Sequence, residues 1–152
     1  MADSQVRTGF LASDLGKTWF QIVGTGNGLP LVTVHGGPGA THDYLEPLEA
    51  LADQRPVVFY DQLGAGKSDR PEDISAWNNE RLIDELSRLL EHLGYDRVHL
   101  LGQSWGTIIA GEYALRRPDR LASLILASPC VSVPRYASAA DALRAELPHD
   151  VR

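Results

Sequence analysis

The chain has 152 residues, of which 43% are hydrophobic and 22% charged, and its formal net charge is −6. This composition is typical of a folded globular domain and excludes an intrinsically disordered chain. The acidic balance, with no run rich in Lys or Arg, argues against nucleic acid or an anionic membrane as a partner.

Membrane insertion and secretion are also disfavoured. The longest apolar-leaning run without charge, residues 121–134, is too short and too interrupted by Ser and Pro to cross a bilayer. Residues 1–10 lack the apolar segment of a signal peptide, so we expect a cytoplasmic protein. Cys130 is the single cysteine, which excludes a disulfide framework and a cysteine-based metal site. We expect no cofactor and no metal.

Secondary structure is predicted to alternate along the chain. Short β-branched, aliphatic or aromatic runs predict strands over residues 6–12, 18–23, 31–34, 57–60, 98–101 and 121–127. Apolar residues at helical spacing predict helices over residues 44–52, 82–93 and 105–117, and a further Ala- and Leu-rich helix over 137–147. Pro47 is assigned to the first turn of its helix, and Gly94 and Pro118 are read as stop signals. The alternation predicts one mostly parallel α/β sheet with ligands at the carboxyl ends of its strands.

The strongest chemical motif is Gly102-Gln103-Ser104-Trp105-Gly106, which lies between a predicted strand and a predicted helix. In a G-x-S-x-G turn of this kind the serine is strained and exposed, and the residues two positions away on either side must be small. We therefore predict that Ser104 is a nucleophile and that the Trp105 N–H points toward an oxyanion.

A second motif, His35-Gly36-Gly37-Pro38-Gly39, follows the buried strand 31–34. Its glycines leave backbone N–H groups uncovered, and Gly37 is the predicted second oxyanion donor. His35 is predicted to be a structural anchor that bonds nearby backbone, because a histidine at the end of a buried strand more often has that role than a catalytic one.

Residues 61–68, Asp-Gln-Leu-Gly-Ala-Gly-Lys-Ser, resemble the end of a phosphate-binding loop. The complete motif requires a glycine where Asp61 stands, and Pro71 prevents an immediate helix, so a nucleotide site is not expected. The Gly-rich segment 24–28 is followed by Leu29-Pro30 where a dinucleotide-binding helix would begin, and it is predicted to be a hairpin or turn.

In this order and spacing, HGGPG, DQxGxGxS and GQSWG resemble the motifs of the proline iminopeptidase family of α/β-hydrolases, which includes related amino-acid amidases and esterases. The resemblance covers about residues 7–133. Leu63 stands where family members more often have Arg, and Gln103 where they more often have Gly, which weakens any inference of a proline preference.

The resemblance implies the α/β-hydrolase fold, a mostly parallel, doubly wound sheet. Residues 1–133 would form the N-terminal part of its core with the first six strands, and residues 134–152 the beginning of a helical cap. Ser104 would attack small amides, N-terminal residues of short peptides or esters, with the Gly37 and Trp105 N–H groups as the oxyanion hole. Gly36 and Gln103 would contact the substrate, and Asp61 and Gln62 would shape the loop beside the site.

The family's triad Asp and His lie beyond the cap. After Cys130, in the order Asp then His, this chain offers Asp141 and His149, but no predicted strand would bring them to Ser104. We therefore expect a C-terminal fragment of the same hydrolase, as a second chain, to supply both residues, and the isolated chain to be nearly inactive. Arg152 at the end is compatible with a tryptic nick.

The alternative is a non-catalytic fragment or interaction module. Without the remaining strands, residues 121–127 would form an exposed apolar edge of the sheet, which could bind a partner chain.

Overall fold

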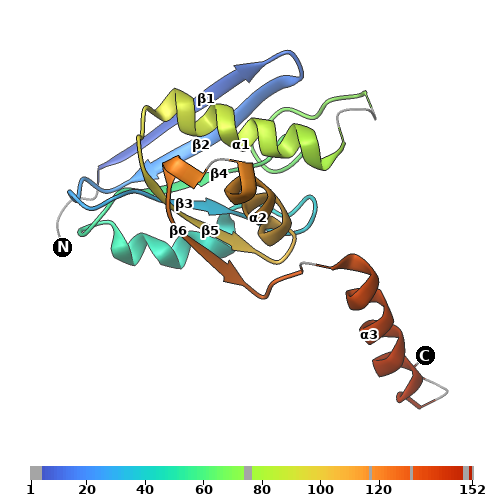
Figure 1. Cartoon of the computed structure of the whole chain (residues 1–152). Helices are drawn as coiled ribbons and strands as arrows, with labels where there is room; N and C mark the ends of the chain where they lie inside the picture. The colour runs from blue at the N-terminus through green and yellow to red at the C-terminus, as the bar shows by residue number, and fades with distance from the viewer. Residues whose placement is uncertain (1–4, 74–76, 117, 131, 149–150, 152) are drawn as a thin grey trace.

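A computed structural model describes residues 5–73, 77–116, 118–130, 132–148 and 151 (Figure 1). Its centre is a six-stranded sheet in the order β1-β2-β4-β3-β5-β6. The strands are β1 (Val6–Ser13), β2 (Gly16–Val23), β3 (Leu31–Val34), β4 (Val57–Tyr60), β5 (Val98–Gln103) and β6 (Leu121–Ala127). Each of the six predicted strands is present, with ends that differ by two residues or fewer.

The sheet has an antiparallel and a parallel part. β1 and β2 form a hairpin, and β2 lies antiparallel to β4. β4, β3, β5 and β6 are parallel, which confirms the predicted mostly parallel sheet and the α/β-hydrolase fold. The segment 24–28 connects β2 to β3, which are not neighbours, so it is not a hairpin. A Cβ on Gly24 would overlap the carbonyl oxygen of Ala52, so this segment packs against other backbone.

The helical elements are η1 (Asp43–Leu51), α1 (Asn79–Leu93), α2 (Gly106–Arg116), η3 (Pro118–Arg120) and α3 (Val133–Ala145). Gly94 ends α1 with a φ of 70°, as predicted. The helix predicted over 44–52 is a 3₁₀ helix and begins at Asp43, so Pro47 lies inside it rather than in its first turn. In an α-helix the proline ring would clash with the carbonyl four residues earlier, which accounts for the difference.

Two apolar cores lie on the two faces of the sheet (Figure 1). On one face α1 and α2 cover the sheet with buried side chains that include Leu86, Leu90 and Ile109. On the other face η1 packs through Leu45 against a smaller cluster around Phe59. The sheet is therefore covered on both sides, as a doubly wound fold requires.

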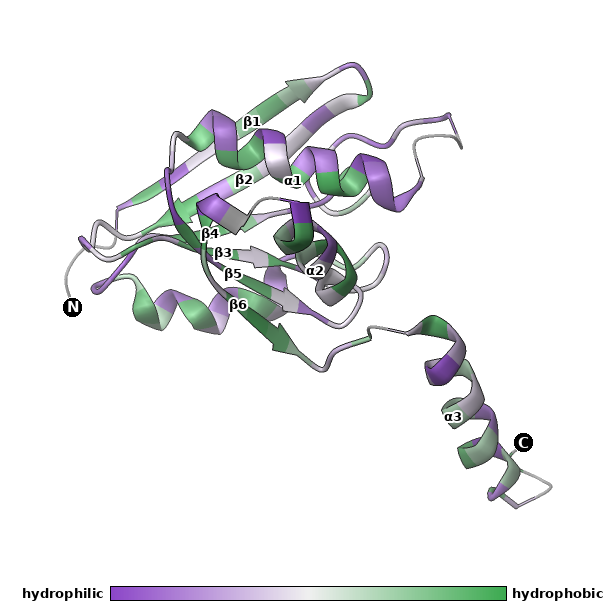
Figure 2. Cartoon of the chain, in the orientation of Figure 1, coloured by the Kyte–Doolittle hydropathy of each residue, from purple (hydrophilic) through white to green (hydrophobic). Residues whose placement is uncertain are grey.

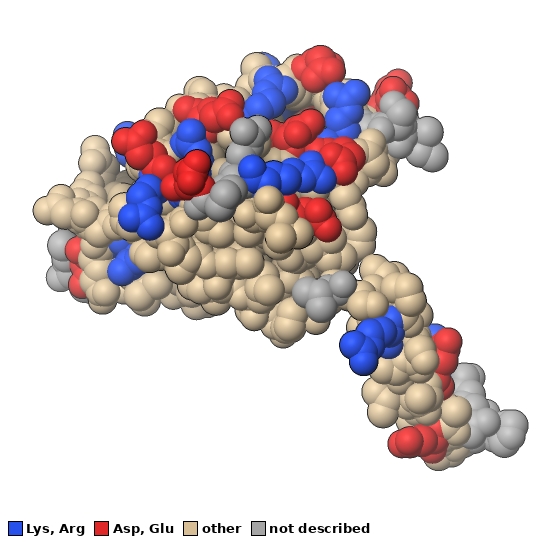
Figure 3. Space-filling model, in the orientation of Figure 1, with Lys and Arg blue, Asp and Glu red and all other residues tan. Residues whose placement is uncertain are grey.

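β6 forms one edge of the sheet, as predicted. Figure 2 shows that the strand is hydrophobic along its length, yet Ile125 and Leu126 remain 43% and 37% exposed. In Figure 3, acidic and basic side chains are interspersed over α1 and the β1–β2 hairpin, whereas the surface over β6 is largely uncharged. α3 projects away from the sheet and has no buried residue among those described (Figure 1).

Glu85 is a carboxyl group inside the first core, only 6% exposed. Its Oε1 accepts hydrogen bonds from Thr18 Oγ1 at 2.5 Å and from the Leu63 N–H at 2.9 Å, which joins α1 to β2 and to the loop after β4. Its Oε2 is buried and has no hydrogen-bond partner among the described residues. Burial raises the pKa of Glu85 from 4.5 to about 7.

We predict that replacing Glu85 by Gln removes a pH dependence of stability. The folded chain holds the Glu85 proton more tightly than the unfolded chain does. The contribution of Glu85 to the free energy of unfolding is therefore fully present below pH 4.5 and is lost as the pH rises through about 7. The loss amounts to about 3 kcal/mol. The Gln oxygen can accept both existing hydrogen bonds, so Glu85→Gln should be more stable than the parent at pH 8 and similar at pH 4.5. Urea denaturation at both pH values tests this, and equal pH slopes in the two proteins would contradict it.

Candidate active site

Ser104 occupies a sharp turn between β5 and α2. Its φ is 52°, in the left-handed region that a side chain other than glycine rarely adopts. A Cβ on Gly102 would overlap the carbonyl oxygen of Gly106, and a Cβ on Gly106 would overlap that of Val34 and lie 2.7 Å from that of His35. The predicted need for small residues on both sides of the serine is therefore confirmed.

Hydrogen bonds hold this turn against the end of β6. The Ser104 N–H donates to the Ala127 carbonyl oxygen at 2.9 Å. The Thr107 hydroxyl donates to the Ser104 carbonyl oxygen at 2.6 Å and accepts from the Cys130 N–H at 3.0 Å. These bonds fix the turn at Ser104 relative to the end of β6, to α2 and to the segment after β6.

An open cleft of about 560 Å³ lies beside this turn. It is lined by Gly37, Ser104, Trp105, Ser128, Pro129, Cys130, Val133 and Tyr136. The structure therefore brings together the three residues predicted as nucleophile and oxyanion donors. Among the described residues, no hydrogen-bond partner is found for the Ser104 hydroxyl or for the Gly37 and Trp105 N–H groups. A carbonyl group placed in the cleft would therefore face a hydroxyl group and backbone N–H donors.

Gly36 and Gln103 lie beside the cleft but are not among the residues that line it. The Gly36 N–H donates to the Tyr44 hydroxyl at 2.6 Å, and that hydroxyl donates to Gln103 Oε1 at 2.8 Å. Tyr44 thus ties the loop 35–39 to the residue before Ser104, although the sequence placed it on an apolar helix face. Partial burial raises the pKa of Tyr44. Substrate contact by Gly36 and Gln103 stays a prediction.

His35 is the buried anchor that the sequence predicts. Its Nδ1 lies 2.9 Å from the Gly36 carbonyl oxygen, and its Nε2 accepts the Gln62 N–H at 2.9 Å. The Gln62 amide donates back to the His35 carbonyl oxygen at 2.8 Å. Burial lowers the pKa of His35, which favours the neutral ring. The pair fixes the start of the loop that carries Gly37.

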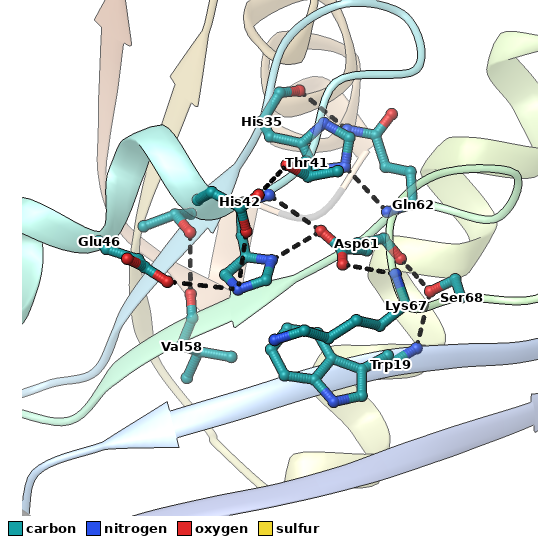
Figure 4. A network of polar contacts seen from close by, with 12 residues as sticks. Trp19, His35, Thr41, His42, Glu46, Val58, Asp61, Gln62, Lys67 and Ser68 are labelled. Atoms are coloured by element: carbon teal, nitrogen blue, oxygen red, sulfur yellow. Dashed lines mark hydrogen bonds and ion pairs between the residues drawn. The ribbon is translucent and has the colours of Figure 1, made fainter.

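The loop 61–68 folds around the carboxylate of Asp61 (Figure 4). Asp61 Oδ2 accepts the Lys67 N–H at 2.9 Å, and the Ser68 hydroxyl donates to the Asp61 carbonyl oxygen at 2.5 Å. A Cβ on Gly66 would overlap Asp61 Oδ2, so this glycine serves close packing on the carboxylate. The roles of Asp61 and Gln62 in shaping the loops beside the site are as expected.

Asp141, the acid that the sequence offers after Cys130, is not among the residues that line the cleft at Ser104. Asp141 lies on the projecting helix α3, where its Oδ1 is 3.2 Å from Arg144 Nη1 and both side chains are 73% exposed. His149 lies outside the described residues.

The comparisons with known proteins agree with the α/β-hydrolase fold. The family model of the alpha/beta hydrolase fold matches residues 30–151. The chain belongs to this family. Within it, the chain is 43% identical over 145 residues to a proline iminopeptidase of Heyndrickxia coagulans, a match that covers 95% of the chain and 50% of the relative. It is 51% identical over 116 residues to a proline iminopeptidase of Clostridium botulinum, covering 74% and 40%.

Comparison with solved structures supports the same fold. A proline iminopeptidase of Mycobacterium smegmatis matches with a TM-score of 0.84 and 36% identity, over 93% of this chain and 50% of that chain. VinJ matches with a TM-score of 0.89 and 37% identity, over 95% and 51%. The resemblance to proline iminopeptidases is confirmed, and the chain spans about half the length of the relatives it matches. Among the described residues, no helix is both long and apolar enough to cross a membrane.

Proposed function

We propose that this chain carries the nucleophile and the oxyanion hole of a serine hydrolase of the proline iminopeptidase or amino-acid amidase type. The proposal is based on the position of Ser104, which has a strained φ of 52° and lines one cleft together with Gly37 and Trp105. Substrates would be small amides, short peptides with a free N-terminal amine, or esters. We also propose the cytoplasm as its location.

In the proposed reaction, Ser104 Oγ attacks the substrate carbonyl carbon and forms an acyl-enzyme, which water then hydrolyses. The N–H groups of Gly37 and Trp105 stabilise the negative charge that develops on the carbonyl oxygen. A histidine base must accept the serine proton and return it to the leaving group. Since Asp141 is paired with Arg144 on α3, we assign the triad Asp and His to a C-terminal fragment of the same hydrolase.

The surface that would receive this C-terminal half is the apolar edge of the sheet. β6 has no neighbour on its outer side among the described residues, and Ile125 and Leu126 are exposed there. We propose that residues 1–133 form the N-terminal part of the core, and that residues 134–152, which include most of α3, begin the cap. The absence of buried side chains on α3 is consistent with a helix that packs against chain supplied from elsewhere.

The test is hydrolysis by the chain alone and by the chain joined to its C-terminal half. L-Prolyl and L-alanyl β-naphthylamides, their N-acetylated forms and p-nitrophenyl acetate distinguish peptidase, amidase and esterase activity. We expect the joined protein to turn over at least one of these substrates about 10³-fold or more faster than the chain alone, because a serine without its base is a poor nucleophile. A joined, folded protein that hydrolyses none of them would contradict the proposal.

The same exposed edge supports the second candidate function, a non-catalytic module that binds a partner chain through β6. This function predicts a folded joined protein without hydrolase activity, together with retained binding of the separately prepared C-terminal half by the 152-residue chain. The two candidates therefore differ in activity and share the interface.

A further inference from the structure

A second polar site surrounds His42, which follows the glycine-rich loop 35–39 in the chain (Figure 4). The side chain of His42 is only 1% exposed, and its Nδ1 lies 2.8 Å from Asp61 Oδ1. Asp61 also accepts the backbone N–H groups of His42 and Lys67. Because an ionised carboxylate can only accept, the ring donates from Nδ1, and in its neutral form it keeps a lone pair on Nε2.

The opposite side of the ring has an unusual environment. His42 Nε2 is buried and has no hydrogen-bond partner among the described residues. It is directed instead at two carboxylates, with Asp43 Oδ1 at 3.4 Å and Glu46 Oε1 at 3.9 Å. One oxygen of each carboxylate and one ring nitrogen lie within 4.8 Å of one another. Both acidic side chains are exposed, by 67% and 54%, so the cluster opens to solvent above a buried nitrogen.

We propose that His42, Asp43 and Glu46 form a binding site for a divalent first-row transition-metal ion, with Zn²⁺ as the probe of choice. Tetrahedral zinc with ligands at about 2.1 Å separates neighbouring ligand atoms by about 3.4 Å. The separation between Nε2 and the Asp43 oxygen is 3.4 Å, and that to the Glu46 oxygen is 3.9 Å. Rotation of the exposed Glu46 side chain closes the second separation, and water from solvent completes four ligands.

The groups around the cluster orient its ligands. A histidine that binds a metal through one nitrogen commonly donates from the other to a carboxylate, which is the relation of His42 to Asp61. The Thr41 hydroxyl donates to Asp43 Oδ2 at 2.8 Å and leaves Oδ1 toward the ring. One imidazole and two carboxylates favour zinc, cobalt or nickel over Mg²⁺ and Ca²⁺, which prefer oxygen ligands throughout.

This site is separate from the proposed catalytic cleft, since none of its three ligands lines that cleft. It also departs from the sequence-based expectation that the chain has no metal site. That expectation was drawn from cysteine-based metal sites only. The three residues are spaced as H-D-x-x-E at the start of η1, and the partner that orients the ring, Asp61, is 19 residues away.

Isothermal titration of the untagged 152-residue chain with ZnCl₂ tests the proposal. We expect one ion per chain, and a loss of affinity of at least tenfold in the double variant Asp43→Asn/Glu46→Gln. Because both residues are exposed, the variant should keep its fold, which circular dichroism checks. Asp53→Asn, on an exposed residue just beyond η1, is the control and should bind zinc like the parent.

Two further measurements complete the test. Zinc at a hundredfold excess over its Kd should raise the Tm of the parent by about 5 °C or more and leave that of the double variant nearly unchanged. Co²⁺ in place of zinc should give the visible absorption of a low-symmetry site in the parent only. Absence of binding at millimolar zinc, or equal affinity in parent and double variant, would overturn the proposal and leave His42 as a purely structural residue.

Discussion

Replacing Ser104 by Ala in the protein joined to its C-terminal half should lower kcat by on the order of 10⁴- to 10⁶-fold, because no other group can form the acyl-enzyme. The fold should persist, because the bonds that hold the turn do not use the Ser104 side chain. The Ser104 N–H donates to the Ala127 carbonyl oxygen, and the Thr107 hydroxyl donates to the Ser104 carbonyl oxygen. Steady-state kinetics with the best substrate of the panel measures the effect. Ser123→Ala, on β6 outside the cleft, serves as a control and should keep kcat within about twofold of the parent.

The glycine variant at the same position separates chemistry from strain. A glycine accepts a φ of 52° without penalty, so Ser104→Gly should be as inactive as Ser104→Ala yet more stable than it, by about 1 kcal/mol in urea denaturation. If Ser104→Gly is inactive and more stable than Ser104→Ala, the backbone strain in the parent is the cost of holding the hydroxyl in its position. Retention of more than a hundredth of parental kcat by either variant would remove Ser104 from the nucleophile role.

Gly106→Ala should be the most destabilising single-methyl change that we predict. The added Cβ would overlap the Val34 carbonyl oxygen and lie 2.7 Å from that of His35, and both are backbone atoms that cannot rotate away. α2 must therefore move off the sheet, at a cost of about 3 kcal/mol in the free energy of unfolding. The same displacement shifts Ser104 from Gly37, so activity should fall as well.

Gly111→Ala is the matched control, because it adds the same methyl group to the same helix. Nothing lies within 4 Å of a Cβ at Gly111, and alanine is the better helix former, so this variant should gain about 0.5–1 kcal/mol. Urea denaturation of both variants measures the difference. Equal stability of the two would mean that the contact between α2 and the end of β3 is not a tight one.

Local signals in the sequence were sufficient for much of the fold. The apolar runs 31–34 and 57–60 became strands buried on both faces, and the spacing of leucines with Gly94 marked the end of α1. The strained turn at Ser104 could be predicted because its geometry demands small residues at fixed neighbouring positions. The helix predicted over 44–52 has the 3₁₀ type because it begins at Asp43, which puts Pro47 past the first turn, where its ring would clash with an α-helical carbonyl.

Long-range polar pairing was what the sequence could not reveal. Glu85 belongs by spacing to a helix, but its burial depends on Thr18, 67 residues away, and on Leu63. Tyr44 reaches Gln103 across 59 residues, and His42 reaches Asp61 across 19. Helical or strand periodicity reports which face is apolar and carries no information about which distant hydroxyl or carboxylate meets a side chain. These pairings depend on the sheet order, which brings the ends of β3, β4 and β5 together.

Fluorophosphonate labelling, read out as intact mass, shows whether this chain supplies the nucleophile to a catalytic centre completed by a C-terminal half. The joined protein should gain one adduct, mapped by peptide digestion to Ser104, and Ser104→Ala should gain none. The 152-residue chain alone should react about 10³-fold or more slowly. A joined, folded protein that stays unlabelled, or one labelled equally in the Ser104→Ala variant, would contradict the account.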